Sequence, residues 1–161
     1  MSQPVGVSLS TMGRLPGPTS VGATLEAGLF SHLSIDSDIS ATVGTRVYLA
    51  IIPQDASLPA ITYQRISGSH VRSLEGSSGA SEARYQITAW ASTGLAAKQL
   101  ADYVRLSLDG FSGAMGDVTV KRVYLEDDRD QFEPAAGNDE ERRNGVLMDF
   151  SIWYHEAKPS F

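Results

Sequence analysis

The sequence has 161 residues, with 13 basic and 19 acidic side chains and a formal net charge of −6. This length suits one domain with a sizeable core, and the acidity argues against a phosphate-binding surface, which needs clustered lysine and arginine. The lack of cysteine excludes disulfides, thiolate metal sites and cysteine nucleophiles, and no apolar run approaches membrane-spanning length.

The first 22 residues have the composition of an arm outside the core. They hold three prolines, four glycines and four serines, without a sustained helical or strand period. Such a segment is either a tail without a role or an arm that orders against a neighbouring chain, because disordered segments can fold on binding. We predict the arm over 1–22, a folded domain over 23–158 and a short C-terminal tail over 159–161.

A short helix and a strand are expected to begin the domain. Thr24 can cap the helix. Three leucines at i, i+4 and i+8 spacing predict its buried stripe: Leu25, Leu29 and Leu33. After the turn signal Gly44-Thr45, residues 46–52 are rich in β-branched and aromatic side chains, and Pro53 ends them.

The next two strands are predicted to form a hairpin. Residues 60–67 (AITYQRIS) follow Pro59, and residues 82–91 (EARYQITAWA) alternate between two faces. The stretch 67–81 between them is too polar and glycine-rich to pack against a core. It is therefore expected to form a long hairpin loop.

The clearest helix follows the hairpin. Ser92 or Thr93 can cap it, and Asp109-Gly110 can end it, because Gly110 can adopt the left-handed conformation. Apolar residues recur along it at helical spacing: Ala97, Leu100, Ala101, Val104 and Leu108. The pattern predicts a helix over 93–108 that packs this stripe against a sheet.

Two strands are expected at the end of the domain, one over about 117–126 and one over 146–155. The segment 127–144 between them is strongly charged and is expected to be flexible. The last strand has the cleanest alternation in the sequence. One of its faces is apolar or aromatic throughout: Val146, Met148, Phe150, Ile152 and Tyr154.

The predicted order α-β-β-β-α-β-β is that of an α+β fold. We expect a mainly antiparallel sheet of about five strands, with two helices packed on one face. Two strands border long polar loops, and the last strand has a partly polar reverse face. Such a sheet can leave an edge open, and an open edge must be blunted or paired.

Signatures of catalysis are missing from the sequence. His32, His70 and His155 lie in three different local contexts, and none has a second ligand at metal-binding spacing. There is no G-x-S-x-G nucleophile elbow and no glycine-rich phosphate loop between a strand and a helix. The sequence therefore predicts no cofactor and no enzymatic activity.

The acidic run Glu126-Asp127-Asp128-Arg129-Asp130 has several interpretations. It can be a solvated strand end, or Asp128 and Asp130 can hold a hard cation or act as an acid/base pair. It can also form ion pairs across a subunit contact, with Arg142 and Arg143 or with Arg65 and Arg72. Such pairs mainly set register and partner choice.

Several unusual strings occur together in this chain: LPAITYQRISG at 58–68, LDGFSG at 108–113, DDRDQFEP at 127–134 and DFSIWYHE at 149–156. With the short N-terminal helix and the stretch from Val43, they resemble the phage tail terminator or tail completion family. The resemblance runs from Leu25 to Glu156, about four-fifths of the chain, in the family's order. Residues 1–22 extend beyond the family's usual start and inherit nothing from it.

The resemblance implies a structural virion protein that forms a ring, expected to be a hexamer, at the head-proximal end of a long non-contractile tail. Its implied partners are other copies of itself, the major tail tube protein and a head connector, adaptor or stopper protein. DNA would pass through the lumen without specific binding, and an acidic lumen would repel its phosphates. The implied location is the neck of a phage or gene transfer agent, after synthesis in the bacterial cytoplasm, with no membrane involved.

A closed ring requires a heterologous interface, in which one patch meets a different patch of the neighbour. We expect sheet edges and the helix 93–108 to form much of it, with the loops 67–81 and 127–145 contacting axial neighbours or the lumen. The candidate interface residues are Arg65, His70, Arg72, Glu75, Glu126, Asp127, Asp128, Arg129, Asp130, Arg142 and Arg143. The alternatives are a small monomeric binding or regulatory domain and, more remotely, a metal-assisted hydrolase using the carboxylates at 126–130.

Overall fold

The computed structural model of the chain describes residues 21–73, 76–133 and 142–155, with side chains described for 25–69, 80–133 and 142–155. The predicted arm falls outside this part of the chain up to residue 20, and so does the predicted tail at 159–161. The helices are α2 (Val21–Ile35), α3 (Ser37–Val43) and α4 (Gly94–Leu108). The strands are β1 (Val47–Leu49), β2 (Ala60–Ser73), β3 (Gly76–Ala91), β4 (Gly113–Met115), β5 (Val118–Glu133) and β6 (Arg143–His155).

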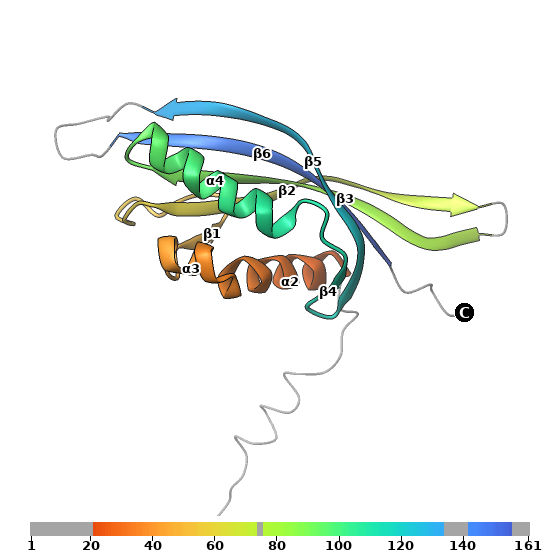
Figure 1. Ribbon diagram of the computed structural model, residues 1–161. Coiled ribbons are helices and arrows are strands. Elements are labelled where there is room, and N and C mark those ends of the chain that lie inside the picture. Colours follow the sequence, from red (N-terminus) through yellow and green to blue (C-terminus); the bar gives the residue numbers. More distant parts are fainter. Residues whose placement is uncertain (1–20, 74–75, 134–141, 156–161) are drawn as a thin grey trace, which may run out of the picture.

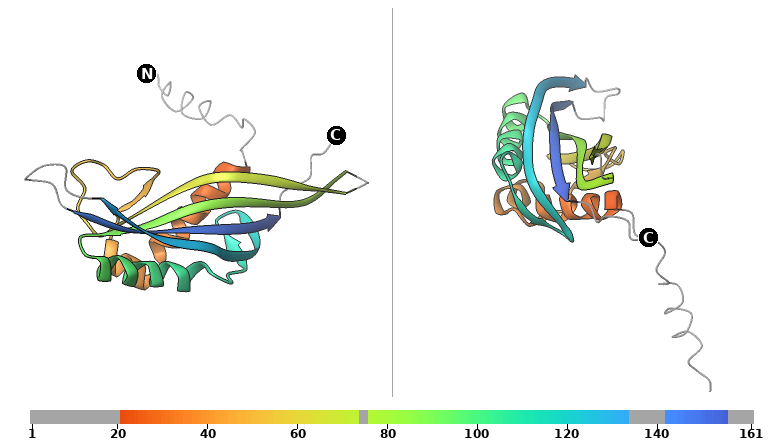
Figure 2. Two further views of the ribbon diagram at one scale, coloured as in Figure 1. Left: turned by 90° about the horizontal axis from the view of Figure 1, so that it is seen from above. Right: turned by 90° about the vertical axis from the view of Figure 1, so that its right-hand side faces the viewer.

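The strands form one sheet in the order β1-β2-β3-β6-β5-β4. β1 pairs with β2 in parallel, and every other neighbouring pair is antiparallel. The helices cover one face of this sheet and leave the other face uncovered by any described element (Figures 1 and 2). The α+β prediction is confirmed, with six strands and three helices in the described part of the chain instead of about five and two.

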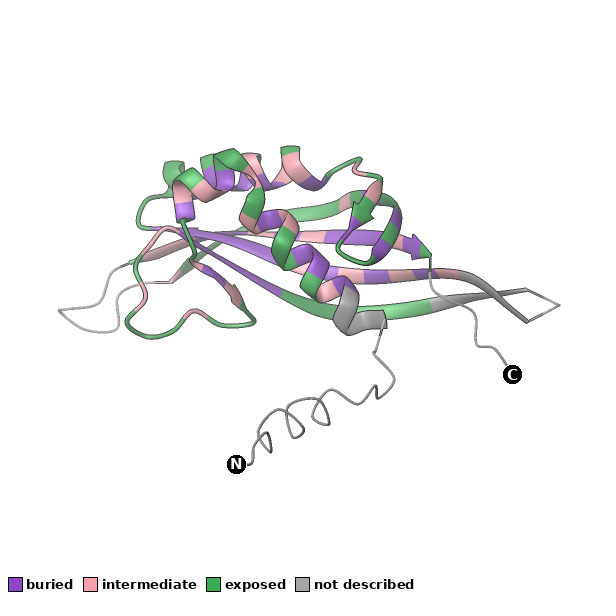
Figure 3. Cartoon of the chain, turned by 90° about the horizontal axis from the view of Figure 1, so that it is seen from below, coloured by how far each residue is buried: buried purple, intermediate pink, exposed green. Residues whose placement is uncertain are grey.

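The core lies between the sheet and the helices. The predicted stripe of α4 is buried, as are Leu25, Leu29 and Leu33 of α2 and the apolar face of β6. Figure 3 shows these buried positions recurring along the helices and the sheet. A fully buried leucine contributes about 1.5–3 kcal/mol, so these stripes hold the helical layer on the sheet.

Both ends of α4 agree with the prediction. Thr93 is the N-cap, and its Oγ1 accepts a hydrogen bond from the Ala96 N–H at 3.2 Å. Gly110 follows the helix with a positive φ of 82°. The prediction for α2 is wrong in one respect, because the helix begins at Val21 and Thr24 lies inside it instead of capping it.

The sequence did not predict α3 or β4. Asp36 caps α3 by accepting hydrogen bonds from the backbone of Asp38 and Ile39, both at 3.0 Å. The helix has only seven residues, too few to show a clear period. β4 has three residues and exists because it pairs with β5. The strand predicted over 46–52 is reduced to β1, because the chain turns at Ala50, whose φ is 68°.

The two long loops predicted at 67–81 and 127–145 are wrong. β2 continues to Ser73 and β3 begins at Gly76, so most of the first segment is a paired hairpin arm. β5 continues to Glu133 against β6, which begins at Arg143. Antiparallel pairing needs only backbone hydrogen bonds, so polar and small side chains can follow a strand beyond the core. Register shifts at Arg65/Ser67, His70/Arg72 and Leu125/Asp127 show that irregular positions are absorbed as bulges.

Candidate assembly surfaces

Both lateral edges of the sheet are only partly covered. β1 pairs with residues 61–63 of β2, and β4 pairs with residues 118–120 of β5. The loop after α4 extends the cover of β5, because Val123 exchanges backbone hydrogen bonds with Gly110 and Phe111 at 2.8 and 3.0 Å. The Leu125 N–H also donates to Asp109 Oδ1 at 3.0 Å. Residues 64–73 of β2 and 126–133 of β5 therefore have a described strand partner on one side only; these are called the open β2 edge and the open β5 edge below.

The acidic run lies along the open β5 edge, and its side chains alternate between the two faces. Asp128 and Asp130 are paired with Met148 and Val146, which are buried under the helices, so both carboxylates lie on the helical side. Asp127 lies on the opposite, outer face with Arg129. This placement agrees with the interpretation of a solvated strand end, because Glu126 and all four following residues are exposed.

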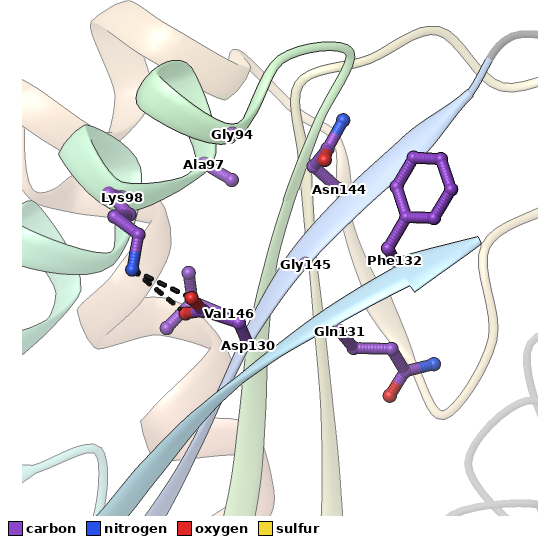
Figure 4. A pocket seen from close by; sticks show the side chains of 9 residues that line it. All are labelled: Gly94, Ala97, Lys98, Asp130, Gln131, Phe132, Asn144, Gly145 and Val146. Carbon is purple, nitrogen blue, oxygen red and sulfur yellow. Dashed lines mark hydrogen bonds and ion pairs between the residues drawn. The ribbon is translucent and has the colours of Figure 1, made fainter. Parts of the chain in front are cut away.

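On the helical side, Asp130 is joined to α4. Lys98 Nζ donates to both carboxylate oxygens of Asp130 at 2.9 Å (Figure 4). The pair borders a hollow of about 300 Å³ between the start of α4 and the ends of β5 and β6, which Phe132 and Asn144 also line. The side chains of Lys98 and Asp130 are 60% and 67% exposed, so the ion pair adds little stability. The buried stripe of α4, and not this ion pair, holds the helix on the sheet.

On the outer face, a row of polar side chains crosses four strands. Gln64 Nε2 donates to Gln86 Oε1, and Gln86 Nε2 donates to Asp149 Oδ1, each at 3.3 Å. Arg129 Nη1 donates to Asp149 Oδ2 at 3.1 Å and to Asp127 Oδ2 at 3.0 Å. The hydrogen bond to Asp149 is the main reason that the pKa of Arg129 is raised. The row ties β2, β3, β6 and β5 together on the face that carries no helices.

The charges of the outer face balance. At paired strand positions with described side chains, it carries four carboxylates and four guanidinium groups. These are Glu82, Asp127, Glu133 and Asp149, and Arg84, Arg122, Arg129 and Arg143. Ser151 Oγ also donates a short hydrogen bond to Glu82. Arg84 Nε is buried without a hydrogen-bond partner in the described part of the chain. The face is therefore polar and close to neutral.

The predicted candidate residues do not form one cluster. Arg65 is exposed on β2, near Tyr85 and Glu26. Strands β3 and β6 separate β2 from β5, which carries the acidic run. His70 and Arg72 belong to β2, with side chains outside the described set, and Glu75 is outside the described residues. Arg142 and Arg143 lie at the start of β6, where Arg143 is paired with Glu133. Within one chain, the acidic run and Arg65 cannot meet.

Near Arg65, burial and Glu26 govern the ionisation of Tyr85. Tyr85 Oη donates to Glu26 Oε2 at 3.3 Å. Burial first, and then the carboxylate of Glu26, raise the pKa of Tyr85 above its ordinary value, while the charge of Arg65 acts in the opposite direction. The tyrosine therefore stays neutral and continues to donate this hydrogen bond across the physiological pH range.

The sequence did not predict the residues that contact the acidic run at 126–130. Lys98 and Asp149 are far from the acidic run in sequence, and only the strand register and the position of α4 bring them to it. His32 has a structural environment: its Nε2 is 3.0 Å from the Ser107 carbonyl, and its ring packs against Phe111.

Among the residues that the structure describes, no three His, Cys, Asp or Glu side chains are placed to hold a metal ion together. None of the described helices is long and apolar enough to cross a membrane.

Comparison with known proteins identifies a family and a solved structure with a similar fold. The family described as "Tail completion protein gp17" matches residues 27–155. Among solved structures, a chain of the "Virion of native gene transfer agent (GTA) particle" has the same fold with a TM-score of 0.63. It is 17% identical, and the match covers 86% of this chain and 99% of that one. No curated protein matches.

Proposed function

Since this chain belongs to the tail completion protein gp17 family, and so is a structural protein of the virion tail and not an enzyme, we propose that it terminates the tail. In this proposal, six copies form a ring at the head-proximal end of a long non-contractile tail. The ring stops polymerisation of the major tail tube protein and offers its other side to a head connector, adaptor or stopper protein.

The observation that carries the proposal is the family match, which includes every described strand and all of α3 and α4. The two open edges support it. They lie on opposite sides of the sheet and differ in sequence, so they can meet in a head-to-tail contact between copies. Contacts of this heterologous kind generate rings when the rotation closes.

We place the outer face of the sheet toward the lumen of the ring. Its charges are balanced, and several are already paired with each other, so the face offers no excess of positive charge to the phosphates of DNA. A surface without net positive charge releases no counterions from DNA and binds it weakly. This refines the expectation of an acidic lumen: low affinity for DNA would come from neutrality and internal pairing.

Particle assembly with and without the chain tests the proposal. In particles made without it, we expect tails of uncontrolled length and heads without tails, as seen by negative-stain electron microscopy. Supplying the wild-type chain should restore tails of fixed length joined to heads. Normal, head-joined tails in its absence would refute the terminator role.

A test with purified proteins separates termination from head joining. Tail tube protein alone should polymerise into long tubes, and adding the chain should leave shorter tubes with density at one end only. Tubes of unchanged length and bare ends would contradict the proposal. An isolated monomer that binds neither tubes nor connector proteins would favour the alternative of a small binding domain.

A further inference from the structure

We propose that neighbouring copies join edge to edge: the open β2 edge of one copy adds to the open β5 edge of the next, forming one continuous antiparallel sheet around the ring. This inference rests on the ring of the proposed function and specifies its interface. The occupant of each edge is a second copy of the same chain, bound mainly through backbone hydrogen bonds.

Strand direction permits this pairing without turning a copy over. From β2 through β3 and β6 to β5, each neighbouring pair is antiparallel. Four strands make an even number, so β5 runs opposite to β2 within one copy. The β5 strand of an identically oriented neighbour therefore arrives antiparallel to β2, as the rest of the sheet requires.

Backbone N–H groups of the open β5 edge point away from β6, toward the position of a neighbouring copy. The N–H groups of Val123 and Leu125 face away from β6, since they bond to the Phe111 carbonyl and to Asp109. Asp128 and Asp130 occupy the same face of the strand, opposite Met148 and Val146. Because backbone and side-chain directions alternate together, their N–H groups also face outward, where no described element covers them.

When Gly68, near the middle of the open β2 edge, is placed opposite Asp130, near the middle of the open β5 edge of the neighbour, the offset between the edges fits a closed barrel. Both edges can be compared through their partners on β6. Gly68 of the open β2 edge pairs with Ala83, which pairs with Ile152 of β6. Asp130 of the open β5 edge pairs with Val146 of β6. The offset along the strands is therefore about six residues, or roughly 20 Å. Three strand spacings within a copy and one between copies add roughly 19 Å across the strands.

These two distances set the tilt of the strands. The direction from one copy to the next makes an angle of roughly 45° with the strands, and closed β-barrels have strand tilts of about 35–45°. Six copies with four long strands each would give about 24 strands, more than the 16–18 strands of barrels that already enclose an aqueous channel. Edge pairing thus yields a ring with an open lumen instead of a flat, growing sheet.

Charge favours pairing of unlike edges over pairing of like edges. The open β5 edge carries four carboxylates between Glu126 and Asp130, with Arg129 as the only basic residue of that run. The described side chains of the open β2 edge, residues 64–69, include Arg65 and no carboxylate. Two β5 edges would bring their carboxylates together, whereas a β2 edge brings Arg65 toward them.

Engineered cysteines test this interface directly, because the chain has none of its own. Ser67→Cys and Ser69→Cys lie on the outer face of the open β2 edge, and Gln131→Cys lies on the same face of the open β5 edge. Each double variant, S67C/Q131C and S69C/Q131C, is oxidised or treated with a short bis-maleimide after ring assembly. We expect at least one of them to give a denaturing-gel ladder that ends at the full ring size.

The single variants are the matched controls. S69C alone or Q131C alone should give no cross-linked dimer within the ring, whereas an equal mixture of the two should give dimers only. Dimers from S69C alone would indicate symmetric β2·β2 pairing and overturn the proposal. If rings form but neither double variant cross-links, the edge pairing is wrong and the ring is retained; if no ring forms alone or on tail tubes, the proposed function fails as well.

A proline variant tests the backbone contribution. Asp130→Pro removes an outward-facing N–H and should leave pairing with β6 intact, because proline is tolerated on an edge strand. We expect at least a tenfold loss of the ring relative to monomer, measured by size-exclusion chromatography with light scattering. Asp130→Ala loses the same ion pair with Lys98 but keeps the N–H, so it should assemble like the wild type. Equal assembly of the proline and alanine variants, both folded by circular dichroism, would overturn the proposal.

Discussion

Gly28→Ala should destabilise the protein, because α2 packs directly on β4 at this position. A Cβ atom on Gly28 would lie 2.6 Å from the carbonyl carbon of Met115 and 3.0 Å from the Gly116 nitrogen. Both contacts are with backbone, which cannot rotate away. Alanine favours a helix by about 0.5–1 kcal/mol over glycine, while overpacking of this kind costs about 1–3 kcal/mol. We therefore expect a net loss of about 1–2 kcal/mol in the free energy of unfolding.

Urea unfolding followed by circular dichroism measures this change, and Gly94→Ala is the matched control. Gly94 also lies in a helix, but its added Cβ would meet only Asn144 Oδ1, at 3.9 Å. The control should be as stable as the wild type or slightly more stable. If Gly28→Ala were as stable as Gly94→Ala, α2 would not contact β4 as closely as described, and the reasoning would be refuted.

Three further changes separate the forces that hold the domain together. Thr93→Ala removes the N-cap of α4 and should cost about 1 kcal/mol in urea unfolding, whereas Ser92→Ala should change little; equal effects would count against the cap. Leu100→Ala, at a fully buried position, should cost about 2–5 kcal/mol, while Lys98→Ala should cost less than about 0.5 kcal/mol because its ion pair is exposed. The raised pKa of Tyr85 means that the folded state keeps a proton which the unfolded state loses above about pH 10, so stability should fall as the pH rises through that value. Tyr85→Phe should reduce this alkaline loss, and an unchanged slope between pH 9 and 11 would contradict the assignment.

The parts of the fold that depend on local sequence could be predicted. Thr93, the apolar stripe from Ala97 to Leu108 and Gly110 define α4 without help from the rest of the chain. The alternation from Val146 to Tyr154 likewise predicted the buried face of β6. These signals are complete within about fifteen residues, so no distant partner was needed to interpret them.

The parts that depend on a distant partner could not be predicted. Residues 127–133 are charged and resemble a loop, yet they continue β5 because β6 provides a backbone ladder beside them. The pairing of β1 with β2 in parallel, and of β4 with β5, also depends on contacts between separate elements. For the candidate surfaces, the acidic run was identifiable by composition, but the row from Gln64 to Asp127 depends on register across four strands.

The two shortest strands have a consequence for the size of the assembly. β1 and β4 have three residues each, and each covers one part of a sheet edge. The loop after α4 extends the cover of β5 to Leu125, and no described strand covers the rest of either edge. In an edge-to-edge ring, the end of each cover, which on the β5 edge is the loop after α4, limits how far a neighbour can slide and so affects the angle between successive copies. Adding or removing two residues in β1 or in that loop would change that angle and with it the number of copies that close. The circumference of the ring would then be encoded in two short segments at the edges of the sheet.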